Sequence, residues 1–111
     1  MKTIRADELE TLRETGQPVE ILDVRSRTEF QKLHIDGAHC LPSAELYPET
    51  LLSARELLPT EPLYLLSRTG TLAQSTACDL ERLGFDNIVV VAGGINAWLK
   101  QGLAVVEENV A

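Results

Sequence analysis

Two short and almost uninterrupted apolar runs restrict most strongly how this chain can fold. Leu63–Leu66 belongs to a strand predicted over Pro62–Leu66. The β-branched run Ile88–Val91 belongs to a strand predicted over Asn87–Val91. Such runs, with no alternation of polar side chains, are typical of strands that are covered on both faces. Because helical patterns alternate with these runs, the sequence predicts an α/β fold, with a mainly parallel sheet and helices on both faces.

The other predicted elements continue this alternation. Further strands are predicted over Glu20–Val24 and Ala38–Leu41. Hydrophobic spacing predicts helices over Ala6–Thr15, Arg27–Leu33, Tyr47–Leu58 and Ile95–Gln101. A further helix is predicted to end at Gly84 and to bury Ala73, Thr76, Ala77, Leu80 and Leu83. In the last helix, Trp98 and Leu99 are expected to face inward.

Length and charge narrow the class of protein. The 111 residues fit one domain, which we take as 1–111 with a core over about 4–106. With a formal net charge of −7, the chain lacks the basic surface of a nucleic-acid binder and would be repelled by anionic lipid. No apolar run approaches the ~18 residues of a membrane span. No apolar signal segment follows Met1-Lys2, so we expect a cytoplasmic location without membrane contact.

The cysteine and histidine content indicates neither a disulfide scaffold nor a metal site. With only Cys40 and Cys78 present, a disulfide-dense secreted fold is excluded. We expect both thiols to be reduced and to pack structurally. His34 and His39 are five residues apart and no Cys-x-x-Cys pair is present, so no metal ligand set is predicted.

The polar turn Ser67–Leu72 is the segment richest in chemistry. In parallel sheets, ligands collect beyond the carboxyl ends of the strands, and the start of the following helix favours an anion. Gly70 permits an unusual backbone angle, Arg68 adds a positive charge, and the threonines add hydroxyl groups. The residues expected to bind an anion are Arg68, Thr69, Gly70, Thr71 and Leu72. The plain alternative is a strand-to-helix connection with Thr71 as N-cap.

Three other features have simpler interpretations. Ser67 lacks the flanking glycines of a nucleophile elbow and has no assignable base, so a serine hydrolase is disfavoured. Asp23 and Arg25 end a predicted strand, and Glu29 follows closely. A structural network, in which Asp23 accepts backbone N–H bonds and Arg25 pairs with a carboxylate, is favoured over a functional role. Gly93-Gly94 lacks the spacing of a phosphate loop and predicts a tight turn.

Two stretches resemble a known family in both order and spacing. The first consists of Ile21-Leu22-Asp23-Val24-Arg25, Glu29-Phe30, His34-Ile35-Asp36-Gly37-Ala38 and Pro42, and the second of Val89–Trp98 with Gly102-Leu103. Together they resemble the opening and closing signatures of rhodanese-like domains, over roughly Ile4 to Val106. The resemblance implies a single rhodanese-like domain of three layers, with a central, mainly parallel sheet of about five strands between helices.

The resemblance also implies a site. In that family, the loop after the fourth core strand carries a cysteine that takes sulfur from thiosulfate or another donor, holds it as a persulfide and passes it on. The matching position here is Ser67, and Leu72 stands where arginine is common. Asp23 and Arg25 become supporting residues. Because a serine hydroxyl cannot form the S–S bond of a persulfide, we expect no rhodanese turnover from this sequence.

Two interpretations of Ser67 remain open. The chain is either a sulfurtransferase-class domain whose native cysteine has been replaced, or a divergent, non-catalytic rhodanese-like module that binds a partner or a small anion. The expected partner is a small sulfur-containing anion, such as thiosulfate or a persulfide donor, or a thiol protein. Neither interpretation implies a nucleic acid, a cofactor or a metal.

Overall fold

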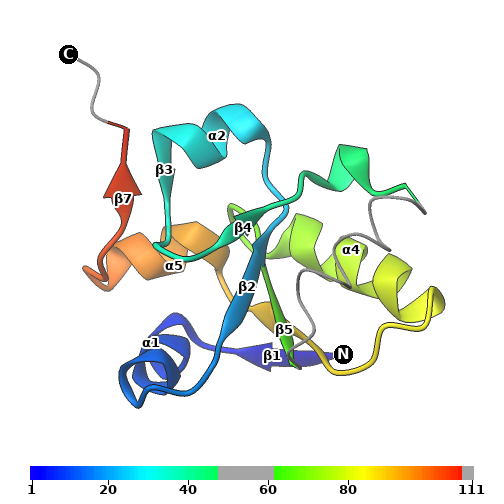
Figure 1. Cartoon of the computed structure of the whole chain (residues 1–111), viewed down its shortest axis with the longest axis horizontal. Helices are drawn as coiled ribbons and strands as arrows, with labels where there is room; N and C mark the ends of the chain where they lie inside the picture. Colours follow the sequence, from blue (N-terminus) through cyan, green and yellow to red (C-terminus); the bar gives the residue numbers. More distant parts are fainter. Residues whose placement is uncertain (48–61, 109–111) are drawn as a thin grey trace.

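The computed structural model describes residues 1–47 and 62–108. Its centre is a parallel sheet of five strands in the order β1-β6-β5-β2-β4 (Figure 1). The strands are β1 (Lys2–Ile4), β2 (Glu20–Asp23), β4 (His39–Cys40), β5 (Leu63–Leu66) and β6 (Ile88–Val91). The neighbouring strands β5 and β6 are buried along their whole length, as their apolar runs predict.

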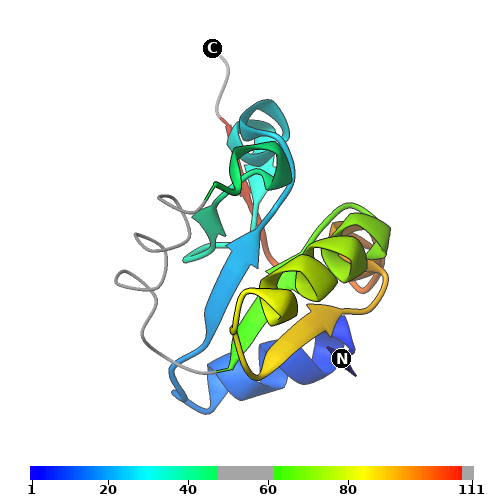
Figure 2. The same ribbon diagram turned by 90° about the vertical axis from the view of Figure 1, so that its right-hand side faces the viewer.

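Helices pack on both faces of this sheet. One face is covered by α1 (Ala6–Glu14) and α5 (Gly94–Lys100), and the other by α4 (Thr71–Arg82), which runs beside β5 and β6 in Figure 2. Successive residues of a strand point to opposite faces. On β5, Leu65 accordingly packs in the core beneath α4, whereas Leu66 packs in the core beneath α1 and α5.

Shorter elements complete the described fold. The helix α2 (Arg27–Lys32) follows β2 and runs into β3 (Leu33–His34). The strand β3 pairs antiparallel with β7 (Val106–Glu107), which returns the C-terminal part of the chain to α2 (Figure 1). A 3-10 turn, η1 (Ser43–Glu45), follows β4. No described helix is long and apolar enough to cross a membrane.

The structure confirms the predicted fold class and the predicted element types. The expected helix over Tyr47–Leu58 lies outside the described residues, apart from Tyr47. The sequence pattern did not predict β1, β3 or β7. These strands have two or three residues each, all exposed or half-buried, so they carry no apolar run.

Three leucines differ from the sequence prediction. Leu33 does not continue α2 but begins β3, with φ −165° and ψ 129°. Leu83 is 57% exposed, because it is the C-cap residue at which the regular face of α4 ends. Leu99 is 41% exposed, whereas Trp98 is fully buried. Each helical residue rotates by ~100°, so the neighbour of an inward side chain points away from the core.

The contrast between Trp98 and Leu99 gives a stability prediction. The Trp98 ring is fully buried and its Nε1 donates to the carbonyl oxygen of Ala104 at 3.0 Å. Trp98→Ala should lower the free energy of unfolding by about 3–5 kcal/mol, because it leaves a cavity. The matched control Leu99→Ala should change it by less than about 1 kcal/mol. Urea denaturation measures both, and equal losses would contradict this placement of Leu99.

Candidate functional site

The turn after β5 lies at the carboxyl edge of the sheet and leads directly into α4. Gly70 is the N-cap of α4, with left-handed backbone angles of φ 99° and ψ −18°. Glycine adopts these angles without steric cost. Thr71 is therefore the first residue of the helix, so the N-cap position expected for Thr71 in the plain alternative is wrong. The hydroxyl oxygens of Thr69 and Thr71 lie 3.5 Å apart at the start of the helix.

Ser67 lies at the centre of this turn. Its side chain is only 1% exposed, and its Oγ accepts hydrogen bonds from the backbone N–H of Gly70 at 3.0 Å and of Ala73 at 3.2 Å. The first amides of a helix have no partner within the helix, so this hydroxyl satisfies two donors at the start of α4. Among the described residues, no histidine or carboxylate bonds to Ser67.

The start of α5 holds the backbone of the same turn. The N–H of Ile95 donates to the carbonyl oxygen of Ser67 at 2.8 Å, and the N–H of Asn96 donates to that of Arg68 at 3.1 Å. Gly94 makes this approach possible. A Cβ there would overlap the carbonyl oxygen of Ser67 and lie 2.6 Å from that of Arg68. The predicted tight turn at Gly93-Gly94 is confirmed, with φ 75° and 60°, but the sequence did not reveal its contact with the turn.

Asp23 and Arg25 form a buried ion pair beside the turn. Arg25 Nη2 lies 2.8 Å from Asp23 Oδ2, and Arg25 Nε donates to Asp23 Oδ1 at 3.0 Å. The same Oδ1 accepts from the backbone N–H of Arg25, and Arg25 Nη2 also donates to the carbonyl oxygen of Leu33 at 2.6 Å. These bonds tie the end of β2 to β3 and form the structural network that the sequence favoured. Because these two side chains make several hydrogen bonds, both of their charges, which would otherwise be costly to bury, are compensated.

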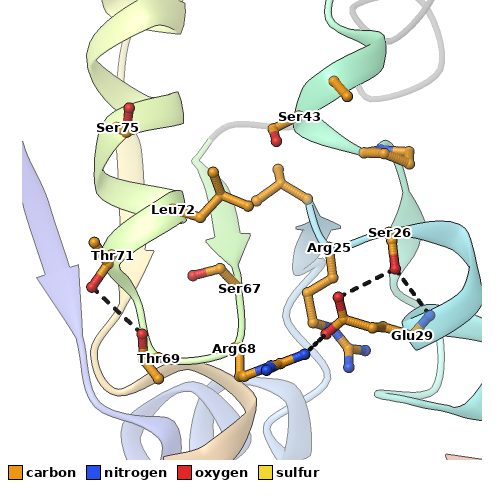
Figure 3. A pocket seen from close by; sticks show the side chains of 13 residues that line it. Arg25, Ser26, Glu29, Ser43, Ser67, Arg68, Thr69, Thr71, Leu72 and Ser75 are labelled. Atoms are coloured by element: carbon orange, nitrogen blue, oxygen red, sulfur yellow. Dashed lines mark hydrogen bonds and ion pairs between the residues drawn. The ribbon is translucent and has the colours of Figure 1, made fainter.

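Arg68 forms an exposed ion pair with Glu29 across the mouth of the site. Its Nη2 lies 2.8 Å from Glu29 Oε2, and Figure 3 shows the two side chains pointing toward one another. Ser26, the N-cap of α2, donates from its hydroxyl to Glu29 Oε1 at 3.2 Å. The hydrogen bond from Arg68 holds the pKa of Glu29 below its ordinary value. The cation expected to meet an anion is therefore already bound to a carboxylate.

These groups surround an open pocket of about 580 Å³. The size is within the range of small-molecule sites. Aliphatic side chains, hydroxyl groups and three charged residues share its wall (Figure 3). The lining residues are Val24, Arg25, Ser26, Glu29, Pro42, Ser43, Ala44, Ser67, Arg68, Thr69, Thr71, Leu72 and Ser75. Leu72, at 43% exposure, presents an aliphatic side chain where the resemblance led us to look for arginine.

Neither cysteine lines this pocket. Cys78 is exposed on α4, so its expected packing in the core is wrong, because it lies off the face that carries Ala77 and Leu80. Cys40 is half-buried in β4, and burial raises the pKa of its thiol. Among the described residues, no group of three acidic, histidine or cysteine side chains could hold a metal ion.

Known proteins resemble this chain in sequence, and solved structures resemble it in fold. The family model described as the Rhodanese-like domain matches residues 5–101. The chain belongs to the rhodanese-like domain family. It is 32% identical over 103 residues to the probable adenylyltransferase/sulfurtransferase MoeZ of Mycobacterium tuberculosis, a match that covers 89% of this chain and 25% of MoeZ.

Two further relatives agree with this assignment. The putative sulfur carrier protein YrkF of Bacillus subtilis is 27% identical over 85 residues, which cover 77% of this chain and 44% of YrkF. The solution structure of the rhodanese-like domain of the Alr3790 protein from Anabaena has a TM-score of 0.82 at 25% identity, over 96% of this chain and 80% of that one. This rhodanese-like chain thus spans less than half the length of MoeZ and YrkF, and it is related to sulfurtransferase domains.

The contact at Gly94 predicts a local effect on the turn. Gly94→Ala should displace the backbone of Ser67 and Arg68, because the new Cβ overlaps carbonyl oxygens that cannot withdraw independently of β5. We expect a loss of about 2–4 kcal/mol in the free energy of unfolding, and amide NMR shifts concentrated at Ser67–Leu72. Gly102→Ala is the control, since its Cβ meets nothing within 4 Å although its φ is also positive. Shifts of equal size at Ser67–Leu72 in both variants would contradict this account.

The two cysteines should differ in reactivity. The thiolate is the reactive form. At Cys40, the raised pKa lowers the fraction of thiolate, and burial limits the access of the reagent to the sulfur. Limited treatment with iodoacetamide at pH 8, followed by peptide mass spectrometry, should therefore label Cys78 several-fold faster than Cys40. Equal rates in the folded protein would contradict the described exposure of these two residues.

Proposed function

We propose that this chain is a rhodanese-like domain of the sulfurtransferase class, built to hold a sulfur nucleophile at position 67 but unable to turn over thiosulfate with serine there. The observation that carries this proposal is the convergence of the Gly70 and Ala73 amides on Ser67 Oγ, in the wall of the pocket. A thiolate at the same position would receive the same two amides and the dipole of α4. Both interactions favour the charged form and lower a thiol pKa.

Serine lacks the sulfur atom that the proposed reaction requires. In the proposed reaction, a cysteine thiolate attacks the outer sulfur of thiosulfate. A new S–S bond forms, the S–S bond of thiosulfate breaks, and sulfite leaves with the bonding electron pair. An acceptor thiolate or cyanide then takes the outer sulfur, and the protein thiolate leaves. The hydroxyl of Ser67 supplies no sulfur for the first bond, and no base bonds to it among the described residues.

The relatives support the sulfur chemistry and suggest partners. The name of MoeZ includes sulfurtransferase, and YrkF is named as a putative sulfur carrier. We therefore propose a thiosulfate or persulfide donor, or a thiol-bearing protein, as the ligand of the pocket. The free thiols of Cys40 and Cys78 are compatible with a reducing compartment such as the cytoplasm, which we propose as the location.

A non-catalytic module that binds a small anion or a partner is the second candidate. The observation in its favour is that the backbone amides of Thr69, Thr71 and Leu72 have no acceptor within residues 1–47 and 62–108. Such amides at the start of a helix can bind an anion or a carbonyl group of a partner without help from Ser67. In this case the turn would keep its shape and its ligand but would perform no chemistry.

The variant Ser67→Cys distinguishes the two candidates. We expect it to gain thiosulfate:cyanide sulfurtransferase activity more than about 100-fold above the Ser67 protein, since the turn then supplies a stabilised thiolate. Mass spectrometry after incubation with thiosulfate should detect one added sulfur atom. Ser67→Ala is the matched control and should stay inactive.

Two results would contradict the first candidate. Turnover by the unaltered Ser67 protein would show that the reaction needs no thiol at this position. An inert but folded Ser67→Cys variant, whose turn amides still shift on addition of thiosulfate, would favour the binding module instead.

A further inference from the structure

Every described arginine at or beside the pocket is already paired with a carboxylate. The pairs are Arg25 with Asp23, Arg68 with Glu29 and Arg27 with Glu45, each with an N–O distance of 2.8 Å. Within the described residues, no other cationic side chain lines the pocket. When the partner carboxylates are counted, these charges cancel, so the described surroundings of the pocket carry no excess positive charge.

The remaining hydrogen-bond donors of the pocket are neutral. Among the described residues, they are backbone amides of the turn and the hydroxyl groups of Ser43, Ser67, Thr69, Thr71 and Ser75. Neutral donors at the start of a helix can bind an anion, but a doubly charged anion loses more hydration energy than a singly charged one, so binding a dianion in this pocket is costly without an unpaired cation. The formal net charge of −7 adds repulsion at long range. The pocket is thus better matched to a polar group of low charge than to a free dianion.

Among the three arginines, Arg68 alone combines a place in the pocket wall with freedom to move. Arg25 is 6% exposed and fixed by several bonds, and Arg27 does not line the pocket. The side chain of Arg68 is 66% exposed, and it donates to Glu29 at the mouth of the pocket. Glu29 is itself held by the hydroxyl of Ser26. The carboxylate therefore both orients this cation and cancels its charge.

We propose that Glu29 is a specificity-determining residue. By binding Arg68 at the rim, Glu29 keeps the pocket close to neutral. The pocket then favours a thiol or persulfide group that is carried on a protein side chain and has at most one negative charge. It disfavours a free inorganic dianion such as thiosulfate. This inference rests on the proposed function for the identity of the substrate. The claim that Glu29 cancels the charge of Arg68 rests only on the geometry and the charges of the pocket.

Sulfate, an unreactive dianion, tests the claim about charge without any turnover. In NMR titrations of the Ser67 protein at low salt, Glu29→Gln should bind sulfate at the Ser67–Leu72 amides roughly fivefold more tightly, because Arg68 then lacks a charged partner. Glutamine keeps an oxygen that can accept from Ser26, so the start of α2 should be preserved. The gain should shrink in 0.5 M NaCl, where added salt screens exposed charges.

Two control variants show whether the gain comes from Arg68. The double variant Glu29→Gln/Arg68→Gln should bind sulfate no more tightly than the unaltered protein. Glu45→Gln removes the same charge from the neighbouring ion pair, whose arginine does not line the pocket, and should change sulfate affinity less than twofold. An unchanged affinity in Glu29→Gln, an equal gain in Glu45→Gln, or a gain that survives in the double variant would overturn the proposal.

The substrate class is tested in the Ser67→Cys background. Adding Glu29→Gln should raise kcat/KM for thiosulfate roughly fivefold and leave kcat/KM for a cysteine-persulfide peptide within about twofold. An equal change for both donors would overturn the selectivity. If Ser67→Cys takes sulfur from neither donor, the proposed function and the substrate class fail together, whereas the sulfate titration still decides whether Glu29 sets the charge of the pocket.

Discussion

The carbonyl oxygens of Ser67 and Arg68 accept hydrogen bonds from the start of α5, while the hydroxyl of Ser67 accepts two from the start of α4. The turn is thus held from two sides by amides that have no partner within their own helices. This double attachment depends on glycine at two positions. Gly70 adopts the left-handed angles that begin α4, and Gly94 lets the backbone of α5 reach the turn. The buried oxygen of Ser67 and the side of the pocket that carries Arg68 take their positions from this turn.

The charges around the pocket follow a consistent arrangement. The pair of Asp23 and Arg25 is buried and closes the end of β2, so it supports the wall. The pair of Arg68 and Glu29 is exposed and lies at the mouth, so solvent and ligands can compete with it. An exposed ion pair contributes little to stability, so the proposed role of this pair in binding does not conflict with a role in holding the fold. The two ion pairs therefore differ in depth: one is buried beside the turn and the other is exposed to solvent.

Much of the fold and the place of the candidate site could be predicted from local sequence patterns. The apolar runs at Leu63–Leu66 and Ile88–Val91 indicated buried parallel strands, and the rule that ligands collect beyond such strands identified the turn after Leu66. The rest depends on contacts between distant residues. Arg68 and Glu29 are 39 positions apart, and nothing in either segment indicates that α2 brings them together. The contact of Gly94 with the turn is likewise a property of the assembled sheet.

Native-state hydrogen exchange at Gly70 and Ala73 tests most directly whether the turn converges on the side-chain oxygen of Ser67. In the unaltered protein both amides should be protected, because each donates to Ser67 Oγ. In Ser67→Ala they should exchange roughly five- to tenfold faster relative to Ala77, whose amide lies within α4. Unprotected amides in the unaltered protein, or rates that Ser67→Ala leaves unchanged, would contradict the account.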